Sequence, residues 1–78
     1  MKSFLQLLLK TILGDGEEFV VEEVKSDNVS IFTIKVNPDL IGKIIGKEGK
    51  TIKAIKNLAA IKAKGQNHFF IKIEEAKF

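Results

Sequence analysis

The sequence predicts an α+β fold whose elements follow in the order α-β-β-α-α-β. Apolar residues recur every three or four positions over residues 4–13 and again over 38–62, which is the period of a helix. They alternate at every second position over residues 18–24, 29–36 and 68–74, which is the period of a strand. Two helices separate the last two strands, so these strands are expected to pair in parallel. We therefore predict a three-stranded mixed sheet covered on one face by three helices.

Length and composition are those of one folded domain over residues 1–78. Hydrophobic residues make up 45% of the chain, charged residues 29%, and proline occurs once, so enough apolar surface exists for a core. The chain has no cysteine, and His68 is its single histidine, which excludes disulfides, thiol nucleophiles and zinc sites built from Cys or paired His. We expect no metal or other cofactor. The lack of cysteine fits the reducing cytoplasm, where we expect the protein to act.

The first predicted element is an amphipathic helix over residues 4–13, which Gly14 and Gly16 end. Gln6 and Lys10 interrupt its apolar run and no small-residue cleavage site follows, so we do not expect a signal peptide. The run is also shorter than the roughly 20 apolar residues of a membrane span, so we expect no membrane contact. The apolar face of the helix carries Phe4, Leu5, Leu8, Leu9, Ile12 and Leu13.

Two strands are predicted next, over residues 18–24 and 29–36. The four residues between them, "KSDN", are good turn formers, so the two strands are expected to form an antiparallel hairpin. Phe32, Ile34 and Val36 share one face of the second strand and are expected to pack against the helices.

A short second helix is expected from Pro38 to about Gly46. Asn37 is a suitable N-cap, Pro38 suits the first helical position, and Asp39 complements the helix dipole. A third helix is expected from about Lys50 to Lys62, and Gly65, three residues later, is expected to stop it. Ile52, Ile55 and Ala59 form the core side of this helix, and Phe69, Ile71 and Ile73 form one face of the final strand.

Positive charge is concentrated in residues 40–64. This stretch holds seven lysines against one acid, Glu48, for a net charge of +6, whereas the remainder holds six lysines and nine acids, for a net charge of −3. Lys50, Lys53 and Lys64 fall on the side of the third helix that faces away from its core residues. The patch is either an ordinary solvated helix face or a nucleic-acid-binding surface.

The loop Gly46-Lys47-Glu48-Gly49 joins the second and third helices. Amides that lead into the third helix are expected to point outward with the positive end of its dipole behind them, an arrangement that receives phosphate. Glycine also removes the Cβ that would hold a sugar-phosphate backbone away. The alternative is purely structural: Gly46 is then a helix C-cap and Gly49 a turn residue.

The sequence does not indicate an enzyme. "GKT" at residues 49–51 is similar to the end of a P-loop, but that motif needs a glycine five positions before Gly49, and Ile44 stands there. No nucleophile, general base and orienting group occur in a catalytic arrangement either. We therefore predict a binding protein with no catalytic residues.

Residues 40–55, "LIGKIIGKEGKTIKAI", resemble the core of a KH domain, in which an aliphatic residue precedes a G-x-x-G loop and a second helix opens with x-x-I. Ile45, Gly46, Gly49 and Ile52 occupy those positions. The predicted order of elements is similar to the type II, prokaryotic, arrangement, so the resemblance covers nearly the whole chain. Among KH proteins it most resembles the small stand-alone bacterial RNA-binding proteins of the KhpA type.

The resemblance implies a groove that holds about four nucleotides of single-stranded RNA, with the G-x-x-G loop clamped on their backbone. It assigns phosphate contacts to Gly46, Lys47, Glu48 and Gly49, nearby charge to Lys43, Lys50 and Lys53, and an apolar floor and wall to Ile44, Ile45 and Ile52, with one of Ile44 and Ile45 in the core. The far wall would come from residues 64–67 and the strand that begins at His68.

The resemblance also implies a role and partners. Proteins of this type are RNA chaperone-like regulators, and some pair with a second KH protein of the Jag type. All basic positions here are lysine where arginine is frequent in such proteins, which favours tracking of phosphates over discrimination of bases, on RNA or on single-stranded DNA. The rival hypothesis is a protein-interaction module that forms a homodimer or heterodimer, with vestigial RNA binding. Ile61, which falls among the lysines of the third helix, and the leucine-rich first helix motivate it.

Overall fold

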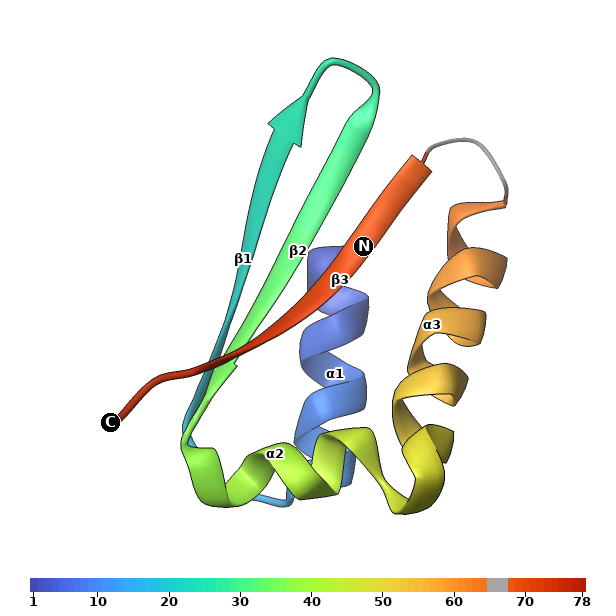
Figure 1. The fold of residues 1–78 in the computed structure, drawn as a ribbon. Coiled ribbons are helices and arrows are strands. Elements are labelled where there is room, and N and C mark those ends of the chain that lie inside the picture. Colours follow the sequence, from blue (N-terminus) through green and yellow to red (C-terminus); the bar gives the residue numbers. More distant parts are fainter. Residues whose placement is uncertain (65–67) are drawn as a thin grey trace.

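Three helices pack against one face of a three-stranded mixed sheet (Figure 1). The computed structural model describes residues 1–64 and 68–78. Its elements are α1 (Lys2–Leu13), β1 (Phe19–Ser26), β2 (Val29–Val36), α2 (Pro38–Ile45), the short 3-10 helix η1 (Lys47–Gly49), α3 (Lys50–Ala63) and β3 (His68–Glu75). The predicted α+β class and the α-β-β-α-α-β order are therefore confirmed. Within the described ranges, no helix has the length and apolar character needed to cross a membrane.

The central strand of the sheet is β2. It pairs with β1 in antiparallel fashion, with Val21 opposite Ile34, and with β3 in parallel fashion, with Phe32 opposite Ile71. The parallel pair forms because α2 and α3 return the chain to the end of the sheet where β2 begins. The predicted mixed sheet is confirmed, and β1 and β3 are its two edges.

The hairpin turn is shorter than the sequence predicts. Pairing extends from Phe19 opposite Val36 to Ser26 opposite Val29, which leaves a two-residue turn rather than the four residues "KSDN". Asp27 takes a left-handed conformation in this turn, with φ of 53°. Aspartate tolerates that conformation because its short side chain can bond locally, and a tight turn lets both strands gain further ladder hydrogen bonds.

The start of α2 departs from the expected capping, and the end of α3 is described up to Lys64. The Asn37 side chain makes no capping hydrogen bond at the start of α2; its Oδ1 accepts a bond of 3.1 Å from the backbone N–H of Phe78 instead. This contact draws the side chain toward the C-terminal segment. The helix α3 ends at Ala63, with Lys64 left-handed at φ of 55° and its N–H donating to the Ile61 carbonyl at 3.1 Å. The predicted stop at Gly65 lies outside the described residues.

The hydrophobic core fills the space between the helices and the sheet. Each helix turns one stripe inward, and the helix-facing side of β2 is buried along most of its length, which confirms the predicted apolar faces. The buried side chains are Leu5, Leu9, Leu13, Val21, Phe32, Ile34, Val36, Leu40, Ile44, Ile55 and Ala59, and the partly buried Phe69, Ile71 and Ile73 of β3 pack against them. Burial of one large apolar side chain contributes roughly 1.5–3 kcal/mol, so these contacts determine which sides of α2 and α3 face solvent.

Candidate nucleic-acid interface

The loop Gly46–Gly49 forms a sharp corner between α2 and α3. Three of its four residues have positive φ: Gly46 at φ 75° and ψ 176°, Glu48 at φ 57° and ψ 25°, and Gly49 at φ 76° and ψ 14°. Only Lys47 keeps an ordinary backbone here. Because the chain turns sharply within these residues, α3 starts directly at Lys50 and contacts α2.

Gly46 occupies a position that no other residue can take without displacing α3. A Cβ built on Gly46 would overlap the Thr51 hydroxyl and would lie 2.7 Å from Thr51 Cβ and 2.9 Å from the Thr51 backbone nitrogen. The first of these contacts involves a movable side-chain atom, but the last is backbone. Nothing in the local sequence marks Thr51 as a partner of Gly46, because the two residues come into contact only once the corner has formed.

Gly49 has a different reason to be glycine. Its φ of 76° lies in the left-handed region, yet a Cβ there would meet nothing within 4 Å. The space beside its backbone is therefore open, which is the condition for close approach of a ligand backbone. In structural terms Gly46 is the C-cap of α2 and Gly49 the N-cap of α3. The structural and the binding interpretations of the two glycines are thus compatible.

Several loop amides are used inside the chain. The Gly46 N–H donates to the Gly42 carbonyl at 2.8 Å, the Gly49 N–H donates to the Gly46 carbonyl at 3.2 Å, and the Lys50 N–H donates to the Lys47 carbonyl. The helical hydrogen bonds of α2 stop at Gly46, so the amides of Lys47 and Glu48 take no part in them. Of the loop amides that were expected to bind phosphate, those of Lys47 and Glu48 therefore remain as candidates.

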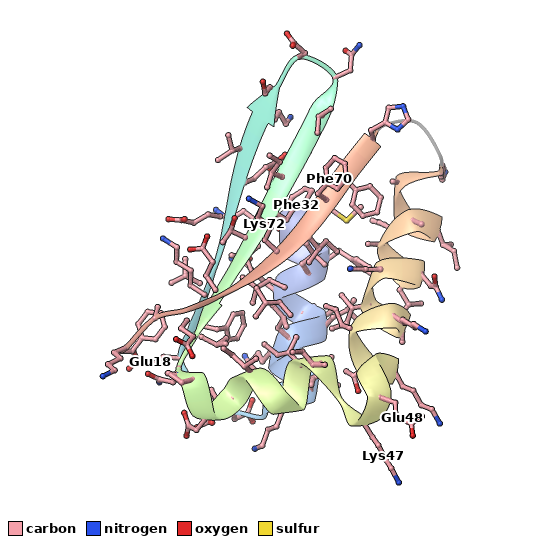
Figure 2. All side chains as sticks on the ribbon, in the orientation of Figure 1. Glu18, Phe32, Lys47, Glu48, Phe70 and Lys72 are labelled. Atoms are coloured by element: carbon pink, nitrogen blue, oxygen red, sulfur yellow. The ribbon has the colours of Figure 1, made fainter. Side chains whose placement is uncertain are left out.

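Exposed lysines surround the corner. The side chains of Lys43, Lys47, Lys50 and Lys53 are all exposed, as is that of Glu48. Figure 2 shows Lys47 and Glu48 at the end of the molecule where α2 meets α3, directed away from its body. Two ion pairs occur within residues 1–64 and 68–78, Lys25–Glu23 at 3.8 Å and Lys35–Glu22 at 3.0 Å, and both lie in the hairpin. The positive charge around the corner is therefore not neutralised by ion pairs with the described carboxylates.

The three isoleucines expected at the groove differ in exposure. Ile44 is fully buried and belongs to the core, because it lies one helical turn after Leu40 on the inner stripe of α2. It cannot form part of a floor that a ligand touches. Ile45 is 38% exposed directly before the loop, and Ile52 is partly buried against the core. The structure thus identifies Ile44 as the residue of the Ile44–Ile45 pair that packs inside.

The far wall of the expected groove is described only in part. Lys64 and His68 are exposed, and residues 65–67 lie outside the described part of the chain. The exposed Lys50 and Lys53 of α3 lie opposite its buried residues Ile55 and Ala59, as the helical period predicts, whereas the exposed Lys64 follows the end of the helix in a left-handed conformation.

Comparison with known proteins identifies relatives of this chain. The family model described as "KhpA/KhpB, KH domain" matches residues 2–73. A protein named RNA-binding protein KhpA from Chlamydia trachomatis is 43% identical over 67 residues, which is 86% of each chain. The protein of the same name from Thermotoga maritima is 40% identical over 58 residues, which covers 74% of this chain and 77% of the relative. The protein of the same name from Oceanobacillus iheyensis is 28% identical over 74 residues, which covers 94% of this chain and 99% of the relative.

The two loop glycines are expected to respond differently to alanine. Gly46→Ala places a methyl group against the Thr51 backbone and should destabilise the fold by at least about 3 kcal/mol, since strain and overpacking act together. Gly49→Ala meets open space and should cost only the left-handed conformation, about 1–2 kcal/mol. Urea unfolding of both variants beside the parent chain measures the two free energies. Equal losses would show that the Gly46–Thr51 contact does not determine the corner.

Proposed function

The chain belongs to the KhpA/KhpB family of KH domains, and from this premise we propose that it binds single-stranded RNA by gripping the phosphate backbone with the loop Gly46–Gly49. The names of the relatives from three bacterial genera support RNA as the ligand. The observation that carries the proposal is the corner between α2 and α3. It combines an open backbone at Gly49 with exposed lysines that form no ion pair within the described residues.

The corner offers two kinds of attraction to a phosphate. The amides of Lys47 and Glu48 are hydrogen-bond donors outside the α2 ladder, and the positive end of the α3 dipole lies behind them. The ammonium groups of Lys43, Lys47 and Lys50 add charge without a fixed geometry. Glu48 is the one acid nearby, and its exposed side chain can turn to solvent while its backbone faces the ligand.

Apolar contact with bases would come mainly from Ile45. This residue directly precedes the loop and is 38% exposed. Ile52, which follows the loop in sequence, is partly buried and would contribute less contact area. Aliphatic surface contacts every base without reading its hydrogen-bonding edge. Together with lysine rather than arginine, this favours sequence-tolerant binding of the kind that an RNA chaperone or a general regulator requires. Single-stranded DNA is the competing ligand, and a direct competition between the two nucleic acids distinguishes them.

Reversal of charge at the corner should abolish most of the RNA affinity. In the double variant Lys47→Asp/Glu48→Asp, carboxylates face the phosphates, and aspartate accepts the left-handed backbone of residue 48. The dissociation constant for a single-stranded RNA oligonucleotide should rise at least tenfold, on the order of 1.4 kcal/mol. Fluorescence anisotropy measures it, and circular dichroism checks that the variant is folded.

Lys77→Asp is the matched control for this variant. It changes net charge by the same amount at an exposed residue of the C-terminal segment, which Figure 1 shows on the opposite side of the fold from the corner. Its RNA affinity should stay within about twofold of the parent. If the double variant kept the RNA affinity of the parent chain, the loop would not be part of the binding site.

The salt dependence should report the number of lysines that contact phosphate. If Lys43, Lys47, Lys50 and Lys53 each neutralise one phosphate, the logarithm of the binding constant should fall with the logarithm of salt concentration with a slope of roughly −3. Lys53→Gln should make this slope shallower by about 0.7, whereas Lys77→Gln should leave it unchanged. A slope near zero in the parent chain would contradict binding through lysines.

Protein interaction through α3 is a second candidate function. Ile61 is 72% exposed and Leu58 is 43% exposed, and both lie on the outer side of α3 between lysines. Two large apolar side chains three positions apart on a helix form a small exposed apolar patch, whose hydration is unfavourable. The likeness to proteins that pair with a Jag-type KH protein makes such a protein the candidate partner. Cytoplasmic location is part of the same proposal.

Ile61→Asp should weaken this pairing selectively. Burial of the new carboxylate in an apolar contact would remove its hydration, so the affinity for a purified Jag-type KH protein should fall at least tenfold. Ala60→Asp, at the exposed neighbouring position, is the control and should change the affinity less than threefold. Isothermal titration calorimetry measures both. Full retention of affinity by Ile61→Asp would exclude this surface.

A further inference from the structure

A cavity lies at the other end of α3 from the corner. It has a volume of about 350 Å³ and is partly open to solvent. Its floor is the helix-facing side of the sheet near the hairpin turn, and its walls are the start of α1, at Met1, and the end of α3, at Lys62 and Ala63. The 14 residues of α3, about 20 Å of helix, separate it from the corner. RNA binding at the corner therefore leaves the cavity without a role.

The cavity exists because the hairpin projects beyond the helices, as Figure 1 shows. The strand register arranges its floor in two rows. Lys25, Ser30 and Phe69 lie opposite one another across β1, β2 and β3, and Glu23 lies opposite Phe32 in the next row. The floor therefore combines charged, hydroxyl and aromatic side chains within a small area.

Glu23 stands where the strand period calls for an apolar side chain. It lies two residues after Val21, whose side chain is buried on the helix side of β1, and opposite Phe32, which is also buried. The Glu23 side chain is 27% exposed, and among the described residues its ion-pair partner is Lys25, at 3.8 Å. Such a carboxylate loses much of its hydration and gains only a distant partner. It is therefore a hydrogen-bond acceptor that a bound ligand can satisfy.

Two lysines at the cavity outnumber this carboxylate. Lys25 belongs to the floor and its side chain is 74% exposed, so it can turn toward a ligand. Lys62 belongs to the wall, where its Nζ lies 5.9 Å from the centre of the Phe4 ring. The last turn of α3 carries the negative end of the helix dipole, which disfavours an anion on the helix axis. An anionic group is therefore expected at the ammonium groups and not at the helix end.

Size, charge and floor together fit a nucleotide. Ligand pockets commonly have volumes of about 300–1,000 Å³, and this cavity lies at the lower end of that range. The partly buried ring of Phe69 offers a surface on which a flat base can stack, and the lysines offer charge for a phosphate. Because β1 and β3 lie about 10 Å apart across β2, a base over Phe69 can meet the long side chain of Glu23.

The carboxylate of Glu23 discriminates among the bases, because it only accepts hydrogen bonds. Guanine presents two adjacent donors, N1–H and the N2 amino group, which match the two oxygens of a carboxylate. Adenine and cytosine place an acceptor nitrogen beside their amino group, and uracil has a carbonyl on each side of its one N–H. We propose that the cavity binds a guanine nucleotide, with the base over Phe69, its N1–N2 edge at Glu23 and its phosphate at the two lysines.

Two sources supply this chemistry. One is a free guanine nucleotide. The other is a guanosine of an RNA strand, outside the nucleotides held at the corner. The second case rests on the proposed function, and the strand must then follow α3 for about 20 Å before it reaches the cavity.

Titration with guanosine 5′-monophosphate, followed in amide NMR spectra of the full chain, tests the proposal. The amides of Ser30, Ala63 and Phe69 should shift and saturate, with a dissociation constant of about 1 mM or less. Uridine 5′-monophosphate carries the same phosphate without the two adjacent donors, so it should bind at least about fivefold more weakly.

Two variants separate the base from the phosphate. Glu23→Gln replaces one of the two acceptors by a donor, so the preference for the guanine nucleotide over the uridine nucleotide should fall to about twofold or less. Lys62→Gln should weaken binding of guanosine 5′-monophosphate at least about threefold and leave that of guanosine, which has no phosphate, within about twofold. Lys77→Gln removes the same charge from the exposed C-terminal segment and should change neither affinity.

Two RNA octamers distinguish the sources of the ligand. One is octauridine, and the other carries guanosine at both ends. If RNA supplies the guanosine, the second octamer should bind at least about threefold more tightly than the first, and Glu23→Gln should remove this difference. If the two octamers bind alike while guanosine 5′-monophosphate still saturates the cavity, the ligand is the free nucleotide.

Four results would overturn the proposal. They are a lack of saturable shifts at the cavity up to about 10 mM guanosine 5′-monophosphate, equally tight binding of the uridine nucleotide, an unchanged preference in Glu23→Gln, and shifts confined to residues 47–49, which would assign the nucleotide to the corner. The variant Lys47→Asp/Glu48→Asp should bind the guanine nucleotide at the cavity as the parent chain does. Its RNA affinity therefore bears on the corner alone, and the two proposals fail separately.

Discussion

The contact between Gly46 and Thr51 is the constraint on which the candidate interface depends. The two residues approach so closely that a single methyl group at residue 46 would meet the backbone of α3. This closeness lets α2 and α3 meet with only four residues between them, Gly46 and the three residues of η1. The corner is then too tight for its residues to fold back on the core. Lys47 and Glu48 are consequently held at the end of the molecule, and the backbone of Gly49 remains accessible.

The core determines what the corner presents. Ile44 and Ile45 are neighbours in sequence with the same side chain, yet one is fully buried and the other is 38% exposed. The helical turn between Leu40 and Ile44 directs both of these inward, and Ile45 is rotated by about 100° from them. On α3, burial of Ile55 and Ala59 turns the lysines toward solvent in the same way. Charge at the surface is thus a consequence of packing inside.

The molecule separates two kinds of surface. The corner between α2 and α3 is basic, with lysines that have no ion-pair partner among the described residues, whereas the side of the sheet that faces away from the helices carries the exposed Val24 and Phe70 and the ion pair between Lys35 and Glu22. The two surfaces therefore suit ligands of different chemistry.

The sequence by itself determined the class of fold, the order of its elements and the position of the loop, because these depend on local periodicity and on the conformational needs of glycine. Hydrophobic residues at the helix or strand period indicate the correct element wherever the pattern is long, as in α1 and β2. The motif from Ile45 to Ile52 likewise indicated the family, which the comparisons then showed.

Tertiary structure decided the rest, because these features depend on residues distant in sequence. The Asn37 side chain bonds to Phe78 rather than capping α2, Thr51 acquires its role only when α3 packs on Gly46, and Ile44 rather than Ile45 enters the core. Period alone showed that Phe70 alternates with Phe69, but not that its side of the sheet would stay uncovered. Which face receives the helices is settled by the direction in which the whole chain folds back, and no local pattern contains that information.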